Sequence, residues 1–269
     1  MSGYPWAAFA VNLGCAAGAA LVVMLVAFAV GVARSLHRVV DIAWGLAFAA
    51  VAAVSYGVSA GHGDDGRRLL VLLATLVWGL RLATHIGYRG RGRGEDPRYK
   101  RMLDKAPHGH RASYALRVVY LRQGALVWLI SLPVQAACYI RGPIDTAARA
   151  GAAVWAAGLV FEAVGDRQLV RFTSDPANHG RIMDRGLWSW TRHPNYFGDF
   201  LVWWGLFLMA CGAWQSVVVS LVSPLLMSFL LTLGSGKRLL EQHMADRPGF
   251  TAYKARTSGF FPLPPRRGA

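Results

Sequence analysis

Acidic side chains are scarce in this sequence. It contains 14 Asp and Glu against 29 Lys and Arg, and only 16% of its 269 residues are charged, whereas 54% are hydrophobic. Soluble globular domains carry about 25% charged residues. The scarcity of charge argues against an ordinary soluble domain, so the excess of positive charge must be interpreted from its distribution along the chain.

Cysteine is almost absent, and the common cofactor and metal motifs are missing. Cys15, Cys138 and Cys211 lie in apolar runs without the spacing of metal ligands. We therefore expect three buried, hydrophobic side chains and no metal centre. No GxGxxG motif follows a strand pattern, and there is no P-loop. A cleaved signal peptide is not expected, because no basic region precedes the first apolar run.

What the sequence has instead is a series of apolar blocks, most of them long enough to cross a bilayer core of about 30 Å. We predict seven transmembrane helices, over residues 7–32, 39–60, 69–88, 118–140, 147–164, 200–211 and 217–233. The predicted fold class is therefore all-α: a polytopic membrane protein with a single membrane-embedded domain.

The positive charge lies on alternate sides of these blocks. Of the 29 Lys and Arg, 22 fall in the segments after the first, third and fifth blocks and in the tail, whereas four fall in the loops between. The positive-inside rule then predicts an N-terminus outside and a C-terminus in the cytoplasm. The polar motifs described next all share the cytoplasmic face, which favours one site there rather than nucleic-acid binding.

The densest polar motif is GLWSWTRHPNYFGD, Gly186–Asp199, which runs directly into an apolar block. An interfacial belt would explain Trp188 and Arg192. It would not explain Asn195 and Asp199, which lie one helical turn apart and enter the apolar side. An amide and a carboxylate on one face suit a ribose or an amide ligand, and an Arg–His pair suits phosphate.

Two further carboxylate positions occur at block ends. Glu162 and Asp166 form an i, i+4 pair at the end of the fifth block, where arginines could relieve their repulsion or a ligand could bind them. Asp41 begins the second block, with Trp44 one turn on. Asp41 is consistent with a helix N-cap or with a catalytic carboxylate.

Other candidates on this face are less specific. Arg81 and His85 lie four apart on the third block and could form a structural network with Asp41. The loop that holds EDPRY, residues 95–99, could be a solvated basic loop. Tyr253 and the basic residues around it could anchor the tail to anionic lipid.

These motifs resemble the steroid 5α-reductase-like membrane family, in particular its bacterial branch of unassigned function (DUF1295-like). The match rests on GLWSWTRHPNYFGD, on Glu162 and Asp166 before it, on WGLRLATHIGYRGRGRGEDPRY, and on the tail RPGFTAYKARTSGFFPLPP. The resemblance implies a seven-helix enzyme of the bacterial inner membrane whose active site faces the cytoplasm. It would use NADPH to transfer a hydride to the C=C bond of a lipophilic enone, steroid-like, isoprenoid or another lipid.

The resemblance also assigns residues to roles. Residues 1–140 would form the substrate side, with Asp41, His85 and Tyr88 as catalytic candidates and Trp44 and Arg81 near the substrate. Residues 141–269 would form most of the cofactor part. The implied cofactor residues are Arg89, Asp96, Arg98, Tyr99, Glu162, Asp166, Arg181, Trp188, Arg192, His193, Asn195, Tyr196, Asp199 and Tyr253.

One position departs from the steroid enzymes of this family. They carry a Tyr directly after the His of the third-block motif, whereas this sequence has Ile86, with Tyr88 two residues on. The acid–Tyr pair that grips a 3-ketosteroid is therefore expected to be absent, unless His85 or Tyr88 substitutes for the Tyr, or the substrate is a different one.

A rival resemblance leads to another chemistry. RHPNYFG followed by an acid is also similar to membrane isoprenylcysteine carboxyl methyltransferases and phospholipid methyltransferases, which bind S-adenosylmethionine with such a segment and a tail Glu, here Glu241. A third alternative is a lipid-binding membrane protein without catalysis, which would leave Asn195 and Asp199 unexplained.

Overall fold

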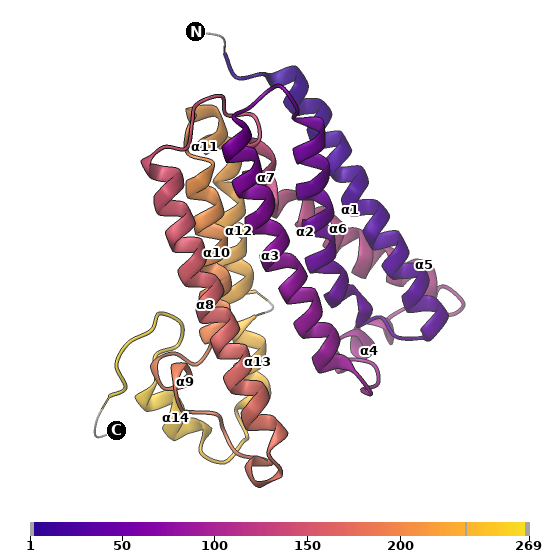
Figure 1. The fold of residues 1–269 in the computed structure, drawn as a ribbon. Helices are drawn as coiled ribbons and strands as arrows, with labels where there is room; N and C mark the ends of the chain where they lie inside the picture. The colour runs from indigo at the N-terminus through magenta and orange to yellow at the C-terminus, as the bar shows by residue number, and fades with distance from the viewer. Residues whose placement is uncertain (1–2, 235, 267–269) are drawn as a thin grey trace. The chain divides into compact units, whose positions relative to one another are not determined.

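The computed structural model describes residues 3–234 and 236–266, and the regular structure in this part of the chain is helical (Figure 1). An isolated bridge between Thr191 and Ser258 is the one β-type pairing recorded there. The chain divides into two compact units, Met1–Ala148 with Met209–Ser223, and Arg149–Leu208 with Pro224–Ala269.

The first unit is built on three long helices and several short ones. Its helices are α1 (Trp6–Arg34), α2 (Val39–Val58), α3 (Asp65–Gly90), α4 (Pro97–Leu103), α5 (Arg111–Ala115), the π-helical η1 (Leu116–Leu121), α6 (Arg122–Ile130), α7 (Leu132–Ala137) and α11 (Trp214–Ser220).

The second unit contains the long α8 and most of α10, with the C-terminal helices. Its helices are α8 (Thr146–Ser174), the 3-10 helix η2 (Pro176–Asn178), α9 (Leu187–Trp190), α10 (Pro194–Met209), α12 (Val222–Thr232), α13 (Lys237–Met244) and α14 (Phe250–Arg256). The ends of α8, α10 and α12 extend into the first unit.

Five helical stretches in the described residues are long and apolar enough to cross a membrane: α1, α2, α3, α8, and α11 continued by α12. This indicates an integral membrane protein, as predicted. The sixth predicted block, residues 200–211, begins earlier than predicted, at Pro194 inside the polar motif, and forms a helix of 16 residues.

The fourth predicted block, residues 118–140, is not one continuous helix. It is divided into η1, α6 and α7, with the break between the last two at Ser131. Pro133 lies just after the break, where its missing N–H costs nothing, because the first turn of a helix has unpaired donors. Hydropathy detected the apolar block but not its interruption.

Glycines allow the long helices to approach backbone to backbone within each unit. In the first unit, a Cβ added to Gly45 of α2 would lie 2.1 Å from the carbonyl oxygen of Gly79 of α3. In the second, a Cβ on Gly198 of α10 would lie 2.5 Å from the amide nitrogen of Glu162 of α8. Small residues at helix contacts are the usual basis of close packing in membranes.

The α8–α10 contact gives a stability prediction. Gly198→Ala forces a methyl group against the backbone of α8, so we expect a cost of about 1–3 kcal/mol, typical of overpacking, and a lower melting temperature. Gly18→Ala on α1 is the matched control, because nothing lies within 4 Å of its added Cβ. The contact would have no such role if both variants melted like the parent protein in the same detergent.

The cysteine prediction is confirmed at one position of three. Cys138 is buried, Cys211 is intermediate, and Cys15 is exposed on α1, so the prediction of burial is wrong for Cys15. Its neighbours on α1, Val11 and Val22, are also exposed, which is expected of a helix face that meets lipid.

Candidate functional site

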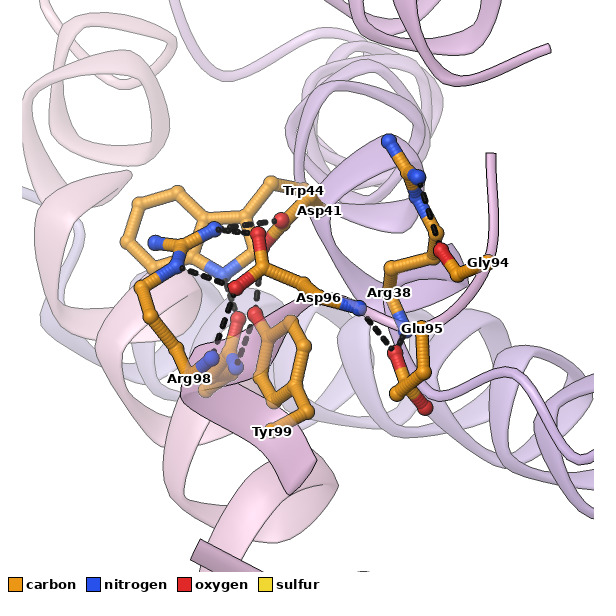
Figure 2. A network of polar contacts seen from close by, with 9 residues as sticks. Arg38, Asp41, Trp44, Gly94, Glu95, Asp96, Arg98 and Tyr99 are labelled. Atoms are coloured by element: carbon orange, nitrogen blue, oxygen red, sulfur yellow. Dashed lines mark hydrogen bonds and ion pairs between the residues drawn. The ribbon is translucent and has the colours of Figure 1, made fainter. Parts of the chain in front are cut away.

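The EDPRY motif connects the start of α4 to the α1–α2 corner (Figure 2). Glu95 accepts hydrogen bonds from the backbone amides of His37, Arg38 and Asp96. The Arg38 guanidinium donates to the carbonyl oxygen of Gly94 at 3.0 Å. A carboxylate that receives three amide donors holds a loop firmly. Glu95 therefore fixes where α4 begins.

Asp96 and Pro97 start α4. The Asp96 carboxylate accepts from the Arg98 amide at 2.8 Å as an N-cap, and Pro97 occupies the first helical position. The same carboxylate accepts two bonds from the Arg98 guanidinium, at 3.1 and 3.0 Å. Burial would raise the pKa of Asp96, but these Arg98 bonds outweigh it and lower the pKa.

Arg98 and Tyr99 both reach Asp41 of α2 (Figure 2). The Tyr99 hydroxyl donates to Asp41 Oδ1, and Arg98 Nη2 donates to Oδ2 at 3.0 Å. Tyr99 is 5% exposed, and its burial, with the charge of Asp41, raises the pKa of its hydroxyl. The hydroxyl consequently keeps its proton at physiological pH.

Gln123 of α6 completes this cluster. Its side-chain oxygen accepts a hydrogen bond from the Trp44 indole, and its amide nitrogen lies 3.5 Å from the Tyr99 hydroxyl. We call Asp41, Trp44, Arg98, Tyr99 and Gln123 the Asp41 cluster. Sequence reasoning missed Gln123, although an amide in the largely apolar fourth block was a usable signal.

The Asp41 cluster bears on two interpretations of Asp41. Asp41 is the third residue of α2 and no side-chain cap bond is made at the start of that helix, so the N-cap interpretation is wrong. Asp41 accepts hydrogen bonds from Arg98 and Tyr99, and the network with Arg81 and His85 stays a prediction.

The other first-unit candidates lie on or next to α3. Arg81 and His85 are partly buried there. Tyr88 is 63% exposed, with the Arg91 guanidinium 5.8 Å from its ring centre, and Arg89 is exposed. The contacts of the Asp41 cluster do not include Tyr88 or Arg89.

In the second unit, α8 and α10 bring the predicted carboxylates and amide together. Glu162 and Asp166 are each 4% exposed on α8, and the Asn195 amide donates to Asp166 Oδ1 at 3.3 Å. Gly165 allows this approach, because a Cβ there would lie 3.3 Å from the backbone nitrogen of Asn195. Asp199 follows one turn later on α10 and is partly buried. The predicted i, i+4 pairs thus lie on two helices in contact.

Arg192 and His193 precede α10 and are both buried. Arg192 Nε donates to Glu241 Oε1 at 2.9 Å, and His193 Nε2 lies 3.1 Å from the same oxygen. Burial lowers the pKa of His193 more than Glu241 raises it, so a neutral ring that donates from Nε2 fits this contact. Tyr196 stacks on His193, with ring centres 5.5 Å apart.

The C-terminal tail, which contains Tyr253, is hydrogen-bonded to the segment that precedes α10. The Tyr253 hydroxyl donates to the Trp188 carbonyl at 2.6 Å, and the Trp188 indole donates to the Gly165 carbonyl at 3.0 Å. Tyr253 is 2% exposed, so the alternative that it anchors the tail to lipid is wrong. Arg181, the remaining cofactor candidate, is exposed.

Lowering the pH is expected to destabilise the packing of this C-terminal tail. The Glu241 pKa is lowered to about 2, because hydrogen bonds from His193 and Arg192 outweigh the effect of burial, which alone would raise it. A carboxyl with a depressed pKa stabilises the folded state above its ordinary pKa, here 4.5, and this contribution is lost as pH falls toward about 2.

Hydrogen exchange over residues 250–258, corrected for intrinsic rates, measures this effect. Protection should fall between about pH 6 and about pH 3 in the parent protein. Glu241→Gln should already show reduced protection at the higher pH and a smaller further loss. Unchanged protection of the parent protein across this range would contradict the role of Glu241.

Comparison with known families now adds one finding. Residues 27–257 match the family model described as protein of unknown function (DUF1295). The chain belongs to the DUF1295 family. No curated protein and no solved structure matches it. The match includes the whole Asp41 cluster as well as Asp166, Asn195 and Glu241, so both candidate sets lie within the DUF1295 region.

Proposed function

We propose that this DUF1295 protein is an NADPH-dependent membrane reductase that acts on the C=C bond of a lipophilic enone. The observation that carries the proposal is the hydrogen bond from Tyr99 to Asp41, held by Arg98 and Gln123. It supplies an acid–Tyr pair, with the acid on α2 and the Tyr on α4. The sequence has Ile86 where the steroid enzymes that this chain resembles have their Tyr.

The chemistry of the Asp41 cluster suits this reaction. Hydride addition to the β-carbon of an enone leaves negative charge on the carbonyl oxygen. The Arg98 guanidinium, whose bonds to Asp41 and Asp96 use Nε and Nη2, can donate to that oxygen from Nη1. The Tyr99 hydroxyl has a single proton, now donated to Asp41, and would donate to the enolate oxygen by turning that proton away from Asp41. A preorganised donor of this kind typically lowers a barrier by about 3 kcal/mol.

The residues of α8 and α10 fit a nucleotide cofactor. Glu162 and Asp166 are buried carboxylates with the Asn195 amide beside them, which together offer hydrogen-bond acceptors and donors to a ligand. Carboxylate and amide groups would bind the ribose hydroxyls and the carboxamide of NADPH. When bound, NADPH supplies the hydride.

The proposal includes a topology. Seven membrane crossings would add the α5–α7 region and α10 to the five apolar stretches, with the C-terminus and both candidate sets facing the cytoplasm of a bacterial inner membrane. At about 1.5 Å per residue, the 16 residues of α10 extend about 24 Å, close to a bilayer core.

A second function is favoured by one contact. Glu241 binds Arg192 and His193, which is the tail-Glu arrangement expected of an S-adenosylmethionine-dependent membrane methyltransferase. The Asp41 cluster has no evident role in methyl transfer, and for this reason we prefer the reductase.

Thermal unfolding of the purified protein with a panel of cofactors separates the two functions. A ligand at 100 times its Kd stabilises a protein by about 2.7 kcal/mol. We expect NADPH to raise the melting temperature and S-adenosylmethionine to leave it unchanged. The reverse result would replace the reductase with the methyltransferase.

A further inference from the structure

A cleft of about 590 Å³ opens in the first unit where α1 ends and α4 and α5 begin. Basic and hydroxyl side chains from three chain segments line it: Ser35 and His37 from the α1–α2 corner, Lys100 from α4, and Arg111 from α5. The proposed reduction uses none of these four side chains.

The two cations of the cleft are available to a ligand. No ion pair or hydrogen bond is recorded for the Lys100 side chain among the described residues. Arg111 lies 3.7 Å from Asp104, but both side chains are more than half exposed, and such pairs contribute about 0–1 kcal/mol. A ligand anion can therefore compete for Arg111.

Glu95, the carboxylate in the cleft wall, already accepts hydrogen bonds from the backbone. Glu95 accepts the backbone amides of Arg38 and Asp96, each at 2.9 Å, and that of His37. These bonds disperse its charge into the loop. An anion in the cleft would therefore meet two cations, and one carboxylate whose charge is already stabilised by backbone amides.

His37 and Ser35 are positioned by the fold. His37 is 8% exposed, and its Nδ1 lies 3.0 Å from the Tyr120 hydroxyl. With that hydroxyl donating to Nδ1, the ring carries its proton on Nε2 and can donate it to a ligand. Ser35, at φ 51°, is the one non-glycine residue with a left-handed backbone in the described chain. Such conformations cluster at ligand sites.

An apolar stripe on α1 leads to the cleft. Val22, Leu25 and Val32 are 60%, 41% and 44% exposed at helical spacing, and Val32 is itself part of the cleft wall. In a membrane helix such a face meets acyl chains. An acyl chain along this stripe would place its headgroup phosphate at the cleft.

We propose that this cleft binds a phosphate group, namely the headgroup phosphate of an anionic membrane phospholipid whose acyl chains lie along α1. Lys100, Arg111 and Ser35 would donate to the phosphate oxygens, which is the usual chemistry of phosphate sites. A free phosphate or a soluble phosphate monoester shares this chemistry, and the test below separates the two sources.

The test is native mass spectrometry of the full-length protein in a detergent without phosphate, titrated with dioleoyl phosphatidylglycerol. The double variant Lys100→Gln with Arg111→Gln is compared with the matched control Arg93→Gln with Lys105→Gln, which removes the same charge from the same loop but outside the cleft wall. We expect at least about tenfold weaker lipid binding in the first, about 1.4 kcal/mol, and parent-like binding in the second. Thermal unfolding of both variants verifies that they fold.

Two further arms complete the test. Dioleoylglycerol, which has the same chains without phosphate, should bind at least about tenfold more weakly than the phospholipid. Inorganic phosphate should compete only weakly, because it lacks the chains. Equal lipid affinity in the two double variants, or equal affinity for dioleoylglycerol, would overturn the proposal. Phosphate that binds as tightly as the lipid would overturn the lipid assignment in favour of a soluble ligand.

Discussion

Asp41→Asn is expected to lower the rate of NADPH oxidation with a lipophilic enone by about 100-fold or more, the usual effect of removing a preorganised charge-stabilising group. The asparagine keeps the shape of the side chain but loses the charge that holds Arg98 and Tyr99. The affinity for NADPH should stay within about twofold, because in this account the cofactor is bound by α8 and α10.

Tyr99→Phe distinguishes catalysis from folding. The substitution removes the hydroxyl that donates a hydrogen bond to Asp41. It should likewise reduce turnover with little change in NADPH affinity. Asp246→Asn is the matched control, since it removes the charge of an exposed acid between α13 and α14. If Asp41→Asn turned over as fast as the parent enzyme, Asp41 would have no part in the mechanism.

Asp199→Ala should abolish the stabilisation of the protein by NADPH. Truncating one carboxylate in a buried hydrogen-bonding site typically costs about 2–5 kcal/mol of binding, which is about 30-fold or more in Kd. Asp199 lies one turn after Asn195 on the helix that packs against Glu162 and Asp166. Fluorescence titration with NADPH measures the loss directly.

The control for this variant removes the same charge elsewhere. Asp246→Ala affects an exposed acid between α13 and α14 and should leave NADPH binding unchanged. A scaffold protein without catalysis would show no difference between the two variants. Retained affinity in Asp199→Ala, with the fold intact, would count against α10 as the cofactor helix.

Much of this architecture could be predicted from the sequence, because long apolar blocks and local polar pairs are properties of neighbouring residues. The first three blocks were predicted close to their observed ends, whereas α10 begins at Pro194, before the predicted sixth block. The i, i+4 pairs Glu162–Asp166 and Asn195–Asp199 could be predicted to share helix faces for the same reason.

Contacts between distant segments could not be predicted. EDPRY was interpreted as a basic loop or as part of the cofactor set, whereas Arg98 and Tyr99 bind Asp41, 57 and 58 residues away. The break at Ser131 and the π-helical turn before it leave little trace in hydropathy. The partner of Arg192 and His193, Glu241, lies in the tail, where no local pattern singled it out except through the rival resemblance.

The most direct test of the reductase proposal follows the transferred hydrogen. Purified protein is incubated with extracted bacterial membrane lipid and NADPH deuterated at its transferable hydrogen, and the lipids are then analysed by mass spectrometry. The account predicts a lipid enone that gains deuterium at its β-carbon, with the parent protein and not with Asp199→Ala. Deuterium entering no lipid, while a labelled methyl group from S-adenosylmethionine does, would contradict it.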